Sequence, residues 1–149
     1  HSERTPEAEA VRDRKVFGIQ SWVALPRDFE ETKPDFVHLS ASEMPLIDDS
    51  GVAVRVVAGE IYGKRSPVHT HSDLFYADAT LAAGALLPIS AEHVERGLFI
   101  ADGQVEIAGQ AFSTGRLLVF LTGAARARRD GNTQPQIRIP GHLSRPVGQ

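Results

Sequence analysis

Short apolar runs separated by turn-forming residues dominate the chain from residue 36 onward. The runs are rich in valine, isoleucine, leucine and phenylalanine, and segments such as Asp48-Asp49-Ser50-Gly51 divide them. The predicted strands cover residues 36–39, 44–47, 52–57, 74–81, 86–89, 116–121 and 136–139. Strands that recur about every ten residues with turns between them predict an all-β sandwich or barrel.

The clearest turn signal is Asp102-Gly103, which separates two apolar runs within residues 97–109. An Asp-Gly pair readily adopts the positive φ angles of a two-residue turn, so this pair predicts a β-hairpin. The segment Ala108-Gly109-Gln110 predicts a second tight turn, directly before Phe112.

The N-terminal part of the chain has a different pattern. Residues 5–14 predict one short exposed helix, because Thr5 can cap it, Pro6 suits its first position and acidic residues follow. Residues 16–25 are mostly β-formers and predict a strand that ends at Pro26, with Trp22 as a core residue. Residues 27–35 are densely charged and predict a solvated linker, and residues 140–149 predict a loose tail.

Composition narrows the class of protein. The 149 residues suit one domain, and 42% hydrophobic residues allow a packed core. A formal net charge of -3 argues against nucleic-acid binding, and there is no apolar run long enough for a membrane helix. The absence of cysteine excludes disulfides and thiolate ligands. The only methionine is Met44, so we expect the chain to be part of a longer protein.

The first candidate for chemistry is the pair His1 and Glu3. Side chains at positions i and i+2 of a strand project from one face, so this imidazole and carboxylate could share one cation. Such a ligand mixture is typical of non-haem iron, and it also suits zinc or manganese. By themselves the residues favour a frayed terminus, unless a segment upstream completes the site.

The second candidate is His69-Thr70-His71, again with i, i+2 spacing. Asp73 or Asp78 could supply a third ligand, but the order of the groups does not require it. An exposed loop or binding face is therefore a better interpretation of these histidines than a metal centre.

Several joined motifs resemble those of bacterial pirins, over about residues 1–121. They are His1-Ser2-Glu3-Arg4-Thr5-Pro6, the segment 17–26, Pro34-Asp35-Phe36-Val37-His38, Ser66-Pro67-Val68 with Thr70-His71-Ser72, Leu74-Phe75-Tyr76-Ala77-Asp78, Ala91-Glu92-His93 and the segment 97–120. Residues 126–149 depart from the family, because the C-terminal aromatic stretch and helix expected of a pirin do not occur there.

The resemblance implies two cupins, which are small antiparallel jelly-roll barrels. Residues 1–26 would be the end of the N-terminal cupin, residues 27–35 the linker and residues 36–139 the C-terminal cupin. In the family, three histidines and one glutamate of the N-terminal cupin hold a metal, usually iron. The last two ligands correspond to His1 and Glu3, and the first two precede this chain.

The general cupin pattern can be aligned with the second cupin in two ways. Starting at Gly84 it gives Ser90, Glu92, Arg96 and Gly103, with every spacing kept and no histidine. Starting at Gly63 it gives His69 and His71, without the glutamate or the final glycine. The Gly84 alignment is preferred, and Arg96 at the carboxylate position then predicts a barrel without metal.

Two classes of function follow from the resemblance. The parent protein is expected to be an iron-dependent quercetin 2,3-dioxygenase-like enzyme acting on a flavonol-like molecule, with Glu3 as the base toward the substrate hydroxyl. The alternative is a non-enzymatic, iron-dependent binding partner of transcription regulators or metabolic enzymes. We also expect a cytoplasmic protein. It should form a homo-oligomer, because the strand at residues 16–25 would expose an unpaired edge.

Overall fold

The computed structural model describes residues 17–90, 92–120 and 136–139. Within these residues the chain forms ten strands and one short 3-10 helix, η1 (Arg27–Phe29). The strands are β1 (Leu46–Asp49), β2 (Val52–Ile61), β3 (Lys64–Arg65), β4 (Phe75–Leu81), β5 (Leu86–Pro88), β6 (Arg96–Phe99), β7 (Gln104–Ile107), β8 (Gln110–Ser113), β9 (Leu117–Phe120) and β10 (Gln136–Arg138). All the strand pairs in this part of the chain are antiparallel, which confirms the all-β prediction.

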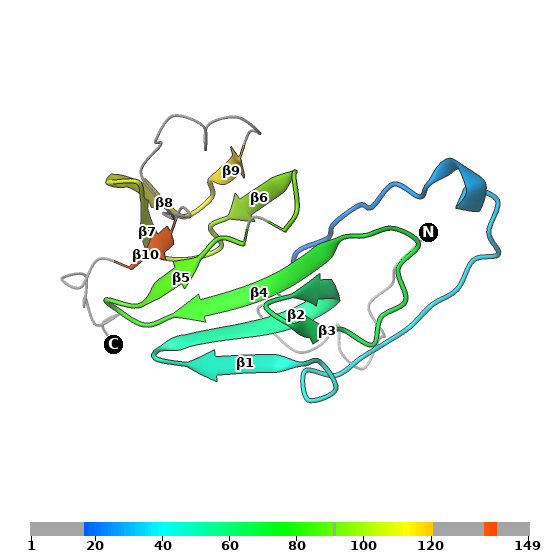
Figure 1. The fold of residues 1–149 in the computed structure, drawn as a ribbon, viewed down its shortest axis with the longest axis horizontal. Helices are drawn as coiled ribbons and strands as arrows, with labels where there is room; N and C mark the ends of the chain where they lie inside the picture. The colour runs from blue at the N-terminus through cyan, green and yellow to red at the C-terminus, as the bar shows by residue number, and fades with distance from the viewer. Residues whose placement is uncertain (1–16, 91, 121–135, 140–149) are drawn as a thin grey trace, which may run out of the picture.

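The first sheet is organised around the long strand β2. Strands β1 and β4 pair with β2 on its two sides, and β3 pairs with its last two residues (Figure 1). Two-residue turns close the β1–β2 and β2–β3 hairpins, and Ser50, Gly51, Tyr62 and Gly63 adopt the positive φ angles that such turns need.

A bulge in β2 explains how so long a strand keeps one face on the core. Val56 pairs with Ala77 and Ala58 with Tyr76, so Val57 is the extra residue on β2. Val54 and Val56 are buried before the bulge, and Gly59 and Ile61 are buried after it. The inserted residue therefore moves the buried positions from even to odd numbers while the same face stays inward.

The remaining strands lie across the core from β2 and β4. Strand order in the second sheet is β5-β10-β7-β8, and β6 and β9 form a separate pair (Figure 1). Buried side chains from the sheets form one hydrophobic cluster, consisting of Val54, Leu87, Ile89, Ile100, Val105, Ile107 and Ile137. The core thus joins residues that are more than 80 positions apart, as expected of a closed β architecture.

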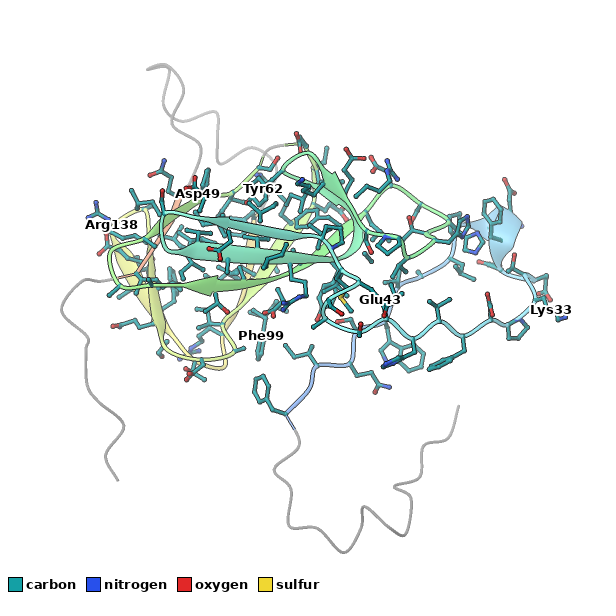
Figure 2. The ribbon with its side chains drawn as sticks, turned by 90° about the horizontal axis from the view of Figure 1, so that it is seen from below. Lys33, Glu43, Asp49, Tyr62, Phe99 and Arg138 are labelled. Atoms are coloured by element: carbon teal, nitrogen blue, oxygen red, sulfur yellow. The ribbon has the colours of Figure 1, made fainter. Side chains whose placement is uncertain are left out.

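The structure corrects the strands predicted at residues 16–25 and 36–39. Residues 17–26 and 33–40 contain no strand, and together they belong to what we call the N-terminal arm, residues 17–40. Trp22, predicted as a core residue, is 86% exposed. β-formers adopt a strand only where a neighbour accepts their backbone hydrogen bonds, and no described strand pairs with the arm. Figure 2 shows the arm around Lys33 extending away from the sheets.

The prediction of a β-hairpin at Asp102-Gly103 is also wrong. Strand β6 pairs with β9 and strand β7 pairs with β8, so the two runs beside Asp102-Gly103 belong to different sheets. The Gly103 carbonyl accepts hydrogen bonds from the backbone N–H and the hydroxyl of Thr114, each at 3.0 Å. The turn is therefore a corner between sheets. The second predicted turn is confirmed, because Ala108 and Gly109 connect the paired strands β7 and β8.

Some predictions fall on residues outside those described. The helix at residues 5–14, the tail at residues 140–149 and the pair His1 and Glu3 belong to this group. The predicted ends of the N-terminal cupin segment at residue 26, of the linker at residue 35 and of the C-terminal cupin at residue 139 stay predictions. Among the described helical residues, there is no segment with the length and apolar character required to cross a membrane.

Candidate functional site

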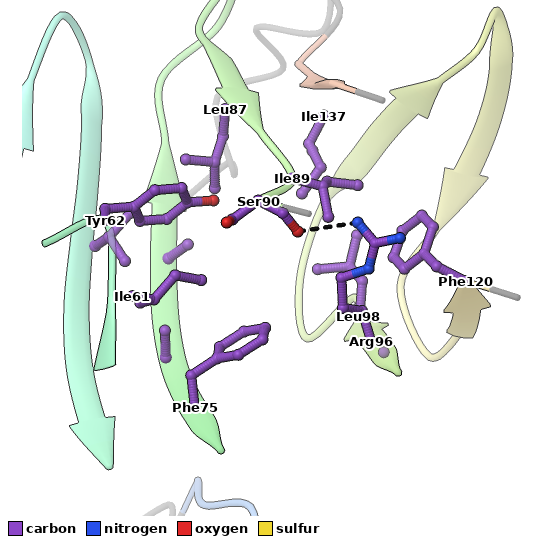
Figure 3. Close-up of a pocket in the computed structure, with 14 residues that line it drawn as sticks. Ile61, Tyr62, Phe75, Leu87, Ile89, Ser90, Arg96, Leu98, Phe120 and Ile137 are labelled. Atoms are coloured by element: carbon purple, nitrogen blue, oxygen red, sulfur yellow. Dashed lines mark hydrogen bonds between the residues drawn. The ribbon is translucent and has the colours of Figure 1, made fainter. Parts of the chain in front are cut away.

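A cavity of about 90 Å³ lies between the sheets and is the candidate site. Six strands contribute to its walls, which are mostly apolar and include Ile61, Phe75, Leu87, Ile89, Leu98 and Phe120. Three polar side chains join them, those of Tyr62, Ser90 and Arg96 (Figure 3). Apolar walls with a few convergent polar groups are typical of small-molecule sites.

Arg96 is the cation of this cavity. Its Nη1 donates a 2.9 Å hydrogen bond to the Ser90 carbonyl, and its Cζ lies 5.8 Å from the centre of the Phe120 ring. Its Nε is buried and has no hydrogen-bond partner among the described residues. Figure 3 shows the guanidinium between Ser90 and Phe120. Part of the hydrogen-bonding capacity of a half-buried cation thus stays unused.

Strand pairing explains why Arg96 lies there. Arg96 is directly opposite Phe120 in the β6–β9 ladder, and Leu98, two residues later, also lines the cavity. Side chains at i and i+2 share a face, so the same strand supplies the cation and an apolar neighbour. The contact with Phe120 is a cross-strand cation–π pair.

Tyr62 closes the opposite side of the cavity. Its φ of 51° places it in the left-handed region, in the turn between β2 and β3. The hydroxyl donates a hydrogen bond to the Pro88 carbonyl, which joins the first sheet to the end of β5. Burial raises the pKa of the Tyr62 hydroxyl, and the Glu92 carboxylate adds to the rise, while a hydrogen bond with the Ser90 backbone opposes it. The neutral hydroxyl is therefore the favoured form.

The structure brings together two of the positions given by the Gly84 alignment. Ser90 and Arg96 meet at the cavity, whereas Glu92 is exposed and its backbone N–H donates to the Ser90 hydroxyl at 3.3 Å. Gly103 is at the corner between sheets. Sequence reasoning missed Tyr62, although the Tyr-Gly pair after an apolar run is a turn signal that could have located it.

The histidines His69 and His71 lie together, and no described residue joins them as a third metal ligand. Their ring centres are 4.8 Å apart, and the His71 ring is 4.7 Å from that of Phe29. Within the part of the chain that the structure describes, no three metal-ligating side chains of His, Cys, Asp or Glu are grouped.

The cavity itself does not suit iron. The described residues that line it include no histidine, cysteine, aspartate or glutamate, and a permanent cation projects into it.

No protein-family model matches the chain, but individual proteins do. A "Pirin-like protein" of Caulobacter vibrioides is 38% identical over 126 residues, which are 83% of this chain and 43% of that protein. "Pirin-1" of Arabidopsis thaliana is 28% identical over 89% of this chain and 48% of its own length. A Pseudomonas aeruginosa protein named "Putative quercetin 2,3-dioxygenase" is 28% identical over 80% of this chain and 36% of its own length.

A solved structure supports the fold. The crystal structure of a Geobacillus kaustophilus protein aligns with a TM-score of 0.61 and 18% identity, over 79% of this chain and 47% of that chain. This likeness supports the expected all-β, cupin-type architecture. The chain spans about half the length of the curated relatives it matches. On these similarities to pirins along most of its length, the chain belongs to the pirin family.

Proposed function

We propose that this chain supplies the metal-free barrel of a quercetin 2,3-dioxygenase-like pirin, in which iron is held by a neighbouring barrel together with His1 and Glu3. The name of the Pseudomonas aeruginosa relative supports the reaction class. The family resemblance of the His1-Ser2-Glu3 motif supports the position of the metal.

The observation that carries the proposal is the composition of the described cavity. Its walls offer a guanidinium and no metal-ligating side chain. Its volume of about 90 Å³ is also well below the roughly 300 Å³ at which drug-sized ligands begin to fit. Both features favour a different site for the flavonol and the iron.

In this proposal His1 and Glu3 share the role of metal ligand, and Glu3 has a second role as a base. The His1 imidazole and the Glu3 carboxylate would bind the metal, along with two ligands that this chain does not contain. The iron, when bound, supplies the activation of flavonol and dioxygen. Glu3 would also accept the proton of the flavonol hydroxyl, because a carboxylate close to the substrate is a suitable general base.

The exposed apolar side chains of the N-terminal arm favour a second candidate, a non-enzymatic protein that binds other proteins in an iron-dependent manner. Phe17 is 79% exposed, Trp22 86% and Phe36 85%. Large exposed aromatic side chains are typical of interaction surfaces. The partners would be transcription regulators or metabolic enzymes, as the family resemblance implies.

Oxygen uptake distinguishes the two candidates. The chain is incubated with ferrous iron and quercetin, and the rate is compared with those of Glu3→Ala and of His69→Ala/His71→Ala as a matched control. The enzymatic proposal expects slow uptake that needs both iron and quercetin, falls to the uncatalysed rate in Glu3→Ala and is unchanged in the control. Uptake that persists at the parent rate in Glu3→Ala, or that is lost only in the His69→Ala/His71→Ala variant, overturns it.

A further inference from the structure

The cavity holds a cation whose hydrogen-bonding groups are only partly used. A guanidinium carries five N–H donors in a planar fork. One of these donates to the Ser90 carbonyl, and the buried Nε has no partner among the described residues. No carboxylate in this part of the chain forms an ion pair with Arg96. A charge that is half removed from water without a counter-ion is unfavourable, so an anion in the cavity would stabilise it.

Ser90 supplies a second donor on the lining of the cavity. The Ser90 hydroxyl accepts a hydrogen bond from the Glu92 backbone N–H, and its own proton has no acceptor among the described residues. Ser90 and Arg96 both line the cavity, and the Ser90 hydroxyl lies on the side of Tyr62, across from the guanidinium (Figure 3). The Tyr62 hydroxyl already donates to the Pro88 carbonyl, so it contributes a polar wall and no further donor.

Shape and polarity define the class of anion. About 90 Å³ admits a molecule of only a few heavy atoms, and the remaining walls are isoleucine, leucine and phenylalanine side chains. A single guanidinium balances one negative charge, and its fork matches the two oxygens of a carboxylate. Gly97 and Ala79 on the lining are exposed, so the cavity communicates with solvent.

We propose that this cavity binds a small monocarboxylate, with its carboxylate on the Arg96 guanidinium and its short aliphatic body against Ile89, Leu98 and Phe120. This site is separate from His1 and Glu3, and it needs neither iron nor a flavonol.

The test is a titration of the full ¹⁵N-labelled chain with sodium acetate and sodium butyrate at constant ionic strength. Inorganic phosphate and chloride serve as control anions. We expect saturable shifts of the Ser90, Gly97 and Leu98 amides with both carboxylates. Binding should be roughly tenfold tighter for butyrate, because two more methylene groups are buried.

Two variants and one control locate the site. Arg96→Gln should weaken butyrate binding at least about tenfold, since a charge-assisted pair is lost. Ala77→Leu keeps the cation and fills the cavity, so it should also abolish binding, and it decides the question if Arg96→Gln does not fold. Arg65→Gln removes the same charge from a side chain that is 72% exposed, and should leave binding unchanged.

Three results would overturn the proposal. They are the absence of saturable shifts at these amides, equal shifts with phosphate or chloride, and butyrate binding that survives in Ala77→Leu. Because no iron or quercetin is present, these outcomes are independent of the oxygen-uptake test.

Discussion

The Ser66 hydroxyl donates a 2.7 Å hydrogen bond to the carbonyl of Val57, the extra residue of the β2 bulge. Ser66 is 5% exposed, and its hydroxyl also accepts a hydrogen bond from the Val68 backbone N–H at 3.2 Å. The bulge leaves a backbone carbonyl outside the strand ladder, and Ser66 satisfies it. One side chain thus supports the irregularity that lets β2 reach Tyr62 with its inner face still on the core.

Replacing this serine tests the role of the contact. Ser66→Ala should lower the free energy of unfolding by about 1–3 kcal/mol, because the Val57 carbonyl loses its partner in a buried position. Urea unfolding followed by circular dichroism measures the change. Ser113→Ala, on an exposed position of β8, is the matched control and should stay within about 0.5 kcal/mol of the parent chain. An equal loss in both variants would contradict the support assigned to Ser66.

Gly59 is a position that only glycine can occupy. Its φ is 67°, and a Cβ built there would lie 1.7 Å from the carbonyl oxygen of Leu74. Gly59→Ala should therefore cost at least about 3 kcal/mol, from the left-handed backbone and the collision together. Gly63 has a similar φ of 70° with open space around it, so Gly63→Ala should cost only about 1–2 kcal/mol. Thermal unfolding of the two variants compares them, and a smaller loss at Gly59 would contradict the close approach of β2 to Leu74.

The raised pKa of Tyr62 should make the stability of the folded chain depend on pH. Its pKa is raised in the folded state, so the folded chain holds this proton more tightly than the unfolded chain does. The resulting stabilisation is complete below the ordinary tyrosine value of about 10 and is lost as the pH rises through the raised folded value. Urea unfolding measures the free energy of unfolding at pH 8 and at pH 10.5. Between these two pH values the free energy should fall less for Tyr62→Phe than for the parent chain.

The same variant gives two independent checks. Tyr62→Phe also removes the hydrogen bond to the Pro88 carbonyl, which should lower stability at pH 8 by about 1 kcal/mol. The chain has two tyrosines, so the ultraviolet titration of the variant reports Tyr76 alone, and the difference from the parent gives Tyr62. A Tyr62 component that titrates at or below the usual value would refute the burial argument.

Self-association of the chain is a further prediction. Its basis is the exposed side chains of the N-terminal arm, because the described part of the edge strand predicted at residues 16–25 does not form a strand. Phe17, Trp22 and Phe36 are all more than three-quarters exposed. Burial of such side chains between copies is favourable, so the isolated chain should form dimers or larger species as its concentration rises. Light scattering over a concentration series measures this, and Trp22→Ser/Phe36→Ser should shift the chain toward monomer. A parent chain that stays monomeric throughout would remove the prediction.

Local signals in the sequence predicted the strands that have neighbours within the chain. Residues 74–81 and 136–139 were placed nearly correctly, since alternation and turn residues mark strands wherever they pair. The same signals failed at residues 17–25 and 36–39, where no described strand pairs with the β-formers. They failed again at Asp102-Gly103, because a turn motif fixes a local bend and cannot fix which strand each arm joins.

The candidate site was predicted to a similar extent. The cupin pattern implied by the resemblance, aligned from Gly84, puts Arg96 at the position of a metal ligand, and the structure places this cation in the cavity with Ser90. The contribution of Tyr62 depends on a bulge and a hairpin that together carry its hydroxyl to Pro88, 26 residues away in sequence. Long-range closure of this kind has no local sequence signal.

The central claim is that the described barrel holds no metal and that iron binding by this chain depends on His1 and Glu3. Its most direct test is the iron content of the chain after incubation with ferrous iron and removal of the excess, determined by plasma mass spectrometry. The parent chain is compared with His1→Ala/Glu3→Ala and with His69→Ala/His71→Ala. The account predicts iron that falls to background in the first variant and is unchanged in the second. Iron that persists in His1→Ala/Glu3→Ala and disappears in His69→Ala/His71→Ala would contradict it.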